Sequence, residues 1–212
     1  MTVKRRSYKS EVRELAASDT HARIIEAARD LLSGGRNLPA FSVDAVATRA
    51  GVTRLTVYNR FGSRRGLLEA VFDDTARRGG LLELSSVIAN PDFHEALRRF
   101  VQVFCAFWTA HGSVFPRISA NATLDEEIGE SLKRRSERRR AVLHALIGRL
   151  RLGNAQTELV DLLFGLTSFE MHQMLSVRKR TPADVERLMQ RSVADAMRHY
   201  VRARRNRKAP GR

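Results

Sequence analysis

The sequence predicts an all-α protein in which a small N-terminal three-helix head precedes a larger C-terminal helical domain. Apolar residues recur at the three- and four-residue spacing of helices along most of the chain. Glycine and proline pairs separate these segments, and no stretch alternates apolar and polar residues as a half-buried strand does. We place the head at 20–66 and the larger domain at 67–203, with a flexible basic arm at 1–19 and a basic tail at 204–212.

Composition narrows the class of partner. The 212 residues carry a formal charge of +15, and 43% of them are hydrophobic. A basic balance of this size favours a polyanionic partner, either a nucleic acid or an anionic membrane surface, over a protein that is merely soluble and basic. Cys105 is the single cysteine, so no intramolecular disulfide forms, which is typical of a reducing compartment. Because we find no secretory signal and no apolar run of about 18 residues, we expect a cytoplasmic protein without a membrane partner.

The first firm helix is expected to begin at Asp19 or Thr20, since either residue suits an N-cap. Its apolar stripe follows the helical repeat and comprises Ile24, Ala27, Ala28, Leu31 and Leu32. The pair Gly34-Gly35 ends it. Residues 1–19 have few large apolar side chains and are interpreted as a flexible arm. Two roles for this arm stay open, a solubilising tail or a segment that contacts a nucleic acid.

The stretch from Phe41 to Leu68 has the pattern of a helix-turn-helix. Ala47 is small where a second helix crosses, Gly51 suits the positive φ of a sharp turn, and Val57 fills the angle between the two helices. The side chains that point away from this core are polar and rich in donors: Arg54, Thr56, Tyr58, Asn59, Arg60 and Arg64. A short helix with such a face suits the major groove of DNA.

The helix that follows begins at Ser63 with an unfavourable first turn. Arg64 and Arg65 oppose the helix dipole, and Gly66 has low helix propensity. These residues favour a phosphate bound at the start of this helix, which would offset the repulsion. The alternative is a pair of solvated surface arginines.

The larger domain is predicted to contain helices near 67–78, 81–89, 93–111, 124–150, 155–177 and 182–200, with a break at Phe115-Pro116. Aromatic and neighbouring side chains in it are candidates for an apolar ligand cavity: Phe104, Phe107, Trp108, Phe115, Phe164, His172 and Met174. Residues of this kind at helical spacing also suit a plain core, and that alternative stays open.

The last two predicted helices, 155–177 and 182–200, are amphipathic neighbours and suit a two-fold dimer interface. The residues assigned to this interface are Leu159, Leu163, Leu166, Val185, Met189, Val193 and Ala196. The alternative is that these helices complete the core of one subunit. We expect no metal site and no cofactor, because the histidines and Cys105 lack ligand spacing. We also expect no enzyme, because no catalytic motif is present.

The head resembles a known family. The residues that carry the likeness are Phe41 to Ala47, then Ala50-Gly51-Val52-Thr53-Arg54-Leu55-Thr56-Val57-Tyr58-Asn59-Arg60-Phe61, then Ser63-Arg64 and Leu67-Leu68. Together they resemble the DNA-binding domain of the tetracycline-repressor (TetR) family, and the likeness covers about residues 20–70. Leu55, Arg64, Arg65 and Gly66 depart from the residues common in that family.

The resemblance implies a C-terminal regulatory and dimerisation domain. It also implies a homodimeric bacterial repressor on a palindromic or pseudo-palindromic operator, associated with the nucleoid, and often released by a small apolar or amphipathic effector. The alternative is a DNA-binding regulator without a ligand. Tyr58, Arg60 and Arg64 fall where the family contacts phosphates, and Arg54, Leu55, Thr56 and Asn59 where it reads bases. The capping positions Ser42, Thr53 and Ser63 complete the expected DNA contacts.

Overall fold

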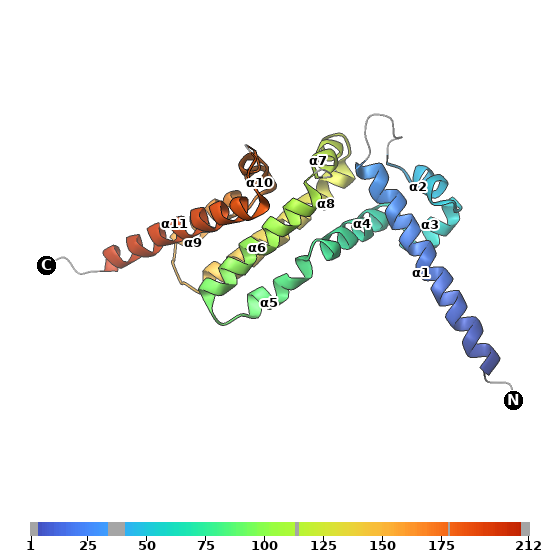
Figure 1. Cartoon of the computed structure of the whole chain (residues 1–212), viewed down its shortest axis with the longest axis horizontal. Helices are drawn as coiled ribbons and strands as arrows, with labels where there is room; N and C mark the ends of the chain where they lie inside the picture. Colours follow the sequence, from blue (N-terminus) through green and yellow to red (C-terminus); the bar gives the residue numbers. More distant parts are fainter. Residues whose placement is uncertain (1–3, 34–40, 113–114, 178, 209–212) are drawn as a thin grey trace. The chain divides into compact units, whose positions relative to one another are not determined.

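A computed structural model describes residues 4–33, 41–112, 115–177 and 179–208. Within these ranges the chain is helical and contains no strand, as the sequence predicts (Figure 1). Two compact units form: Met1–Thr75 with Val114–Ser131, and Ala76–Ser113 with Leu132–Arg212. We refer to them as the head unit and the body unit. The head unit therefore includes a segment that the sequence assigns to the larger domain.

The head unit is built on helix α1. Its helices are α1 (Lys4–Ser33), α2 (Val43–Ala50), α3 (Arg54–Phe61), most of α4 (Arg64–Arg78), α7 (Phe115–Leu124) and the first turns of α8 (Glu126–Gly148). Ile24 and Leu32 on α1 are fully buried, and α2 packs along this helix (Figure 1). His21 stacks on Phe61 with ring centroids 4.9 Å apart. The predicted apolar stripe of the first helix thus anchors the helix-turn-helix.

Helix α1 begins earlier than expected. In the stretch expected to be a flexible arm, the backbone of residues 4–19 is helical, and Asp19 and Thr20 lie inside the helix. The physical reason is that 4–33 contains neither glycine nor proline, so nothing interrupts the turns that precede the buried stripe. At the other end, α11 (Pro182–Lys208) continues through most of the expected tail. The predicted stop at Gly34-Gly35 lies outside the described residues.

Helix α7 was not expected, because Phe115-Pro116 was interpreted as a break. Proline near the first position of a helix costs no hydrogen bond, because the N–H groups of the first turn have no partner within the helix. Two side chains of α7 satisfy carbonyls at the end of α1: Asn121 Nδ2 donates to Leu32 O (3.1 Å) and Arg117 donates to Ser33 O (2.6 Å). The segment thereby completes α1, whose last carbonyls lack helical partners.

The body unit is organised around α6 (Phe93–His111). Its other helices are the 3-10 turn η1 (Leu81–Glu83), α5 (Leu84–Ala89), α9 (Ala155–Leu166), α10 (Phe169–Leu175), α11 and the rest of α8. Asp92 caps α6 by accepting from two backbone N–H groups, and Phe100 is fully buried against its neighbours. The Cys105 thiol lies 3.4 Å from the Met189 sulfur, and burial raises its pKa to about 12. It therefore stays protonated and unreactive.

The region 155–177 forms two helices rather than one. The turn at Thr167-Ser168 separates α9 from α10, and Ser168 caps α10 by accepting from the Met171 N–H (3.1 Å). Helices α9 and α11 pack against each other within the body unit. Packing within the body unit buries five of the seven residues assigned to a dimer interface: Leu159, Leu163, Val185, Met189 and Val193. Their assignment is corrected, because a side chain inside the subunit core offers no surface to a partner. Leu166 and Ala196 are half-buried.

Candidate nucleic-acid interface and ligand pocket

The turn between α2 and α3 has the geometry that the sequence predicts. Gly51 adopts the left-handed conformation (φ 64°, ψ 39°), and the N–H groups of Gly51 and Val52 close the end of α2 on Thr48 O (3.2 Å) and Ala47 O (3.0 Å). Thr53 caps α3 by accepting from the Thr56 N–H (3.1 Å). Val57 is buried, so the register of α3 is fixed and its opposite face is directed to solvent.

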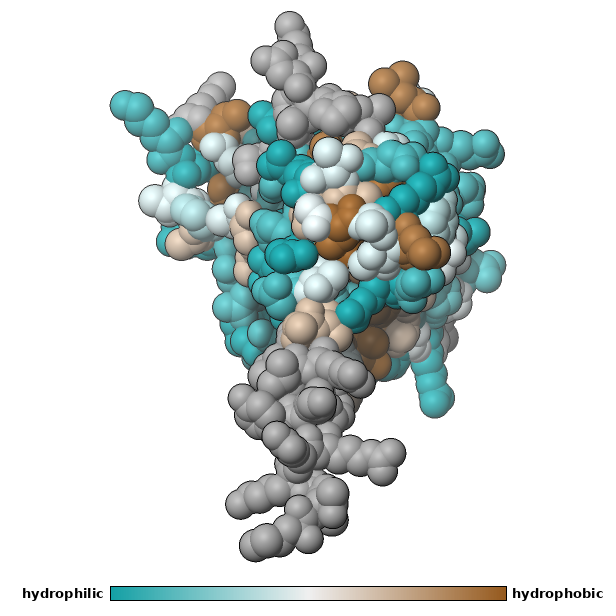
Figure 2. Space-filling model, turned by 90° about the vertical axis from the view of Figure 1, so that its right-hand side faces the viewer, coloured by the Kyte–Doolittle hydropathy of each residue, from teal (hydrophilic) through white to brown (hydrophobic). Residues whose placement is uncertain are grey.

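The solvent face of α3 is polar apart from one residue. Thr53, Arg54, Asn59 and Arg60 are exposed, and Leu55 is 67% exposed among them. Thr56 and Tyr58 are half-buried, as is the cap of α2, Ser42. Figure 2, viewed from the side on which α2 and α3 lie in Figure 1, shows a mostly hydrophilic surface with separate hydrophobic groups. An exposed leucine amid donors suits a surface that meets both polar base edges and thymine methyl groups.

Arg54 is held in place by its neighbours. Its guanidinium donates to Asp44 Oδ2 (2.8 Å) and to the Tyr58 hydroxyl (3.3 Å), and it lies 5.4 Å from the centre of the Tyr58 ring. Asp44 on α2 and the Tyr58 ring on α3 hold this side chain along α3, which is the recognition helix of the helix-turn-helix. Several of its five donors remain for a partner.

Arg64 makes its contacts within the head unit. Its guanidinium forms ion pairs with Asp125 and Glu127, donates to Phe41 O (3.4 Å) and stacks over the Phe41 ring at 5.1 Å. Partial burial alone would raise the pKa of Asp125, but the hydrogen bonds from Arg64 and from the Ile128 N–H outweigh it and lower that pKa. Arg64 thus joins the first turn of α4 to the start of α8. Its assignment as a phosphate contact stays a prediction.

Gly66 also has a structural explanation. A Cβ at this position would lie 2.0 Å from Phe61 O, the last carbonyl of α3. Ser63, which is exposed, caps the same turn by accepting from the Gly66 N–H (3.0 Å). Only a residue without a side chain allows α4 to start so close to the recognition helix. Of the three residues that suggested a bound phosphate, only Arg65 is left exposed to meet one.

The ion pairs of Arg64 give a test of its role. Arg64→Ala is expected to destabilise the protein by about 1–2 kcal/mol, because two half-buried carboxylates lose their hydrogen-bonded partner. Chemical denaturation measures this change in the absence of DNA. Arg65→Ala removes the same charge from an exposed neighbour and is the control, with an expected change within about 0.5 kcal/mol. Unchanged stability of Arg64→Ala together with weakened DNA binding would support the phosphate-contact assignment.

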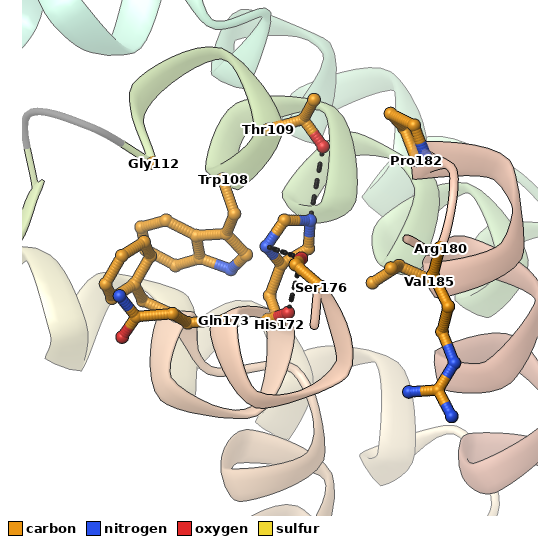
Figure 3. Close-up of a pocket in the computed structure, with 10 residues that line it drawn as sticks. Trp108, Thr109, Gly112, His172, Gln173, Ser176, Arg180, Pro182 and Val185 are labelled. Carbon is orange, nitrogen blue, oxygen red and sulfur yellow. Dashed lines mark hydrogen bonds between the residues drawn. The ribbon is translucent and has the colours of Figure 1, made fainter. Parts of the chain in front are cut away.

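A pocket of about 370 Å³ opens in the body unit between the end of α6, α10 and the start of α11 (Figure 3). Ten residues line it: Trp108, Thr109, Gly112, Phe169, His172, Gln173, Ser176, Arg180, Pro182 and Val185. Burial lowers the pKa of His172, which is therefore neutral at pH 7. Its Nε2 lies 3.1 Å from the Thr109 hydroxyl.

Of the seven side chains predicted to line a ligand cavity, the structure brings Trp108 and His172 to this pocket. Phe104 and Phe107 are core residues, Phe164 is half-buried beneath two arginines, and Met174 is 62% exposed. Phe115 lies on α7 in the head unit. The sequence analysis missed Gln173 and Ser176, although they follow the predicted His172 at i+1 and i+4, a spacing that places the three on one side of a helix.

Arg139 supports the wall behind Trp108. It is buried on α8, donates to Phe164 O (3.2 Å) and the Thr167 hydroxyl (3.2 Å), and stacks on Phe164 at 3.9 Å. Burial lowers the pKa of Arg139 to about 10. Its charge lies at the C-terminal end of α9, where a helix dipole favours a cation. The indole N–H of Trp108 donates to Thr167 O (3.0 Å), so this end of α9 holds the ring in place.

Comparison with known proteins agrees with this architecture. Residues 24–71 match the model of the bacterial regulatory proteins of the tetR family. A structure assigned as a TetR-family transcriptional regulator from Mesorhizobium loti is 20% identical, with 85% of this chain and 96% of that chain covered and a TM-score of 0.58. A regulator of the TerR/AcrR family from Aquifex aeolicus is 14% identical (82% and 98% covered, TM-score 0.59). A transcriptional regulator from Saccharomonospora viridis in complex with choline is 18% identical (86% and 97% covered, TM-score 0.58). No curated protein matches the chain.

These likenesses to solved structures show a shared fold. A capped helix-turn-helix with a polar recognition face, carried on a helical protein, defines a DNA-binding transcriptional regulator. Residues 24–71 therefore match the DNA-binding domain of TetR-family transcriptional regulators, and the described chain shares the fold of solved regulators of that family. In the described ranges, no helix is long and apolar enough to cross a membrane, and no cluster of His, Cys, Asp and Glu is arranged to hold a metal ion.

Proposed function

We propose that the protein is a homodimeric repressor that binds a palindromic or pseudo-palindromic operator and is released from it by a small apolar or amphipathic effector. The observation that carries the proposal is the solvent face of α3, where exposed donors surround Leu55 on a helix whose register Val57 fixes. Arg54, Leu55, Thr56 and Asn59 are proposed to read base edges. Tyr58 and Arg60 are proposed to contact phosphates, together with the caps Ser42, Thr53 and Ser63.

The proposed dimer interface moves to the side of α9 that the subunit leaves uncovered. Leu162 is 41% exposed, and Leu166 follows one turn later on the same side of the helix. Large apolar side chains on the surface of a body helix favour burial against a second copy. Two-fold symmetry would also present two recognition helices to the two halves of a palindrome.

The effector part of the proposal rests on the pocket beside Trp108. Its size lies within the range of small-molecule sites, and apolar rings form much of its wall. The structure from Saccharomonospora viridis holds choline, which supports a ligand site in a protein of this fold. The alternative, a body that serves only dimerisation or protein contacts, differs in one respect: no small molecule would change operator affinity.

Selection of bound sequences from a random duplex library tests the proposal. A symmetric motif with two half-sites about one helical turn apart, or a multiple of it, is expected. Leu162→Glu should sediment as a monomer and bind such a site far more weakly. Transcription from a promoter carrying the selected site should fall when the protein is added. A single asymmetric half-site bound by a monomer would contradict the dimer, and increased transcription would contradict the repressor.

A further inference from the structure

We propose that the pocket of the body unit binds an amphipathic anion whose apolar body lies against Trp108 and Phe169 and whose anionic head group is bound by Arg180. This inference rests on the proposed function, because it names the chemical class of the effector that the pocket would take. The hydrogen bonds inside the pocket decide which polar groups remain for a ligand.

The apolar surface comes from three helices. Trp108 on α6, Phe169 on α10 and Val185 on α11 line the pocket, and Pro182 borders it at the start of α11. The Trp108 ring meets Phe169 edge to face, with centroids 5.6 Å apart. Since the indole N–H donates to Thr167 O, Trp108 presents only its apolar ring to the cavity. These side chains favour a ligand with an aromatic or aliphatic body.

Three polar residues of the lining, Thr109, His172 and Ser176, are bonded to one another. The Ser176 hydroxyl donates to His172 O (2.7 Å) and lies 3.5 Å from His172 Nδ1 (Figure 3). Because the serine proton is used on the carbonyl, Nδ1 is the donor of that second contact. Nε2 of the neutral ring then accepts from the Thr109 hydroxyl at 3.1 Å. This trio uses its donors internally, so it lines the cavity without supplying a proton to a ligand.

The donors that remain are at the rim. Arg180 and Gln173 are exposed, and Arg180 donates to the carbonyl of Leu175 (3.1 Å), a neutral acceptor. Among the lining residues that the structure describes, Arg180 is the one cation, and none is an aspartate or a glutamate. Asp184, which lies in the first turn of α11, is bonded to Thr181 and Arg187. An anion therefore finds a guanidinium at the rim, whereas a cation finds no opposite charge in the lining.

The volume limits the size of the ligand. At about 30 Å³ for each water-sized group, 370 Å³ holds about a dozen such groups. A carboxylate on a single phenyl ring with a short chain fits this size. Because Arg180 lies at the rim and the rings line the interior, the ligand would enter with its apolar end first.

The test uses three probes with the same body: 3-phenylpropanoate, its amide, and 3-phenylpropylamine. Trp108 is the only tryptophan in the chain, so its fluorescence reports directly on the pocket, and calorimetry gives the dissociation constants. We expect the carboxylate to bind about tenfold more tightly than the amide, and the amine to bind most weakly. An amine that binds as tightly as the carboxylate, or the absence of binding by every probe, would overturn the proposal.

Substitutions at the rim separate charge from packing. Arg180→Gln should reduce carboxylate affinity to that of the amide and leave amide binding unchanged. Gln173→Glu should weaken the carboxylate and strengthen the amine. Arg191→Gln alters an exposed arginine of α11 outside the pocket and is the control. Equal carboxylate affinity in the wild type and in Arg180→Gln would contradict the role of Arg180.

Operator binding, measured without any probe, keeps this inference separate from the proposed function. If the carboxylate binds and operator affinity falls, both stand. If it binds and operator affinity is unchanged, the chemistry of the pocket stands and release by an effector fails. If operator binding is normal and no probe binds, the ligand class fails and the DNA-binding function stands.

Discussion

Gly66→Ala is expected to lower the midpoint of thermal unfolding by about 2–12 °C and to impair DNA binding at the same time. The added Cβ would lie 2.0 Å from Phe61 O, so either the first turn of α4 or the end of α3 must move by more than 1 Å. Overpacking of this kind costs about 1–3 kcal/mol, and about 2–4 °C accompanies each kcal/mol in a protein of this size. The displacement acts on the recognition helix itself, which is why both properties change.

Differential scanning calorimetry and operator titration measure the two effects of Gly66→Ala. Gly148→Ala is the matched control, because a Cβ there meets Gln156 at an ordinary 3.6 Å and the residue is helical. It should be neutral or slightly stabilising, as alanine is in a helix. A Gly66→Ala protein with the wild-type midpoint and wild-type operator affinity would show that α3 and α4 do not approach as closely as described.

Arg54→Ala is expected to reduce the affinity for the operator by about tenfold to a hundredfold in each half-site, and by the product of the two in a dimer. Asp44 and Tyr58 hold the guanidinium beside the exposed face of α3, so little side-chain order is lost when it meets a guanine. A residue that reads a base changes the selectivity of the protein among operator sequences. The wild type should discriminate among operator variants at one position, and the alanine variant should bind all of them alike.

Titration of Arg54→Ala against a set of single-base operator variants gives this result. Arg49→Ala removes an exposed arginine from α2 that is bonded to Asp30 at 2.6 Å, and it controls for the loss of charge. If Arg54→Ala weakens binding equally to every variant and keeps the wild-type preference, Arg54 contacts a phosphate rather than a base.

The sequence predicted the parts of the fold that depend on neighbouring residues. Ala47, Gly51 and Val57 lie within ten positions of one another, and their spacing was enough to place α2, the turn and α3 correctly. The role of Arg64 depends on Asp125 and Glu127, which are about sixty positions away in the sequence. No local pattern announces such a pair, so the unfavourable first turn of α4 was interpreted as a sign of an external phosphate.

The body was harder to predict for a different reason. Apolar residues all around 155–177 indicated burial on several sides, but not whether the second neighbour is another helix of the same chain or another subunit. Packing of α9 against α11 takes Leu159, Leu163 and Met189 into the subunit core and leaves Leu162 outside. Helical periodicity predicts which residues share one side of a helix. Whether that side faces the subunit core or another subunit depends on the helices packed around it.

The head unit is assembled from two separate stretches of the chain, and this has a practical consequence for anyone who exchanges reading heads between regulators. A fragment cut after residue 75 would lose the α7 side chains that close the end of α1 and both carboxylates that hold Arg64. The shorter piece would carry every residue that we propose to read bases, but it would lack part of the packing that supports them. A working chimera therefore has to contain residues 115–131 as well as the N-terminal segment. The boundary of the head unit cannot be cut at a single position in the gene.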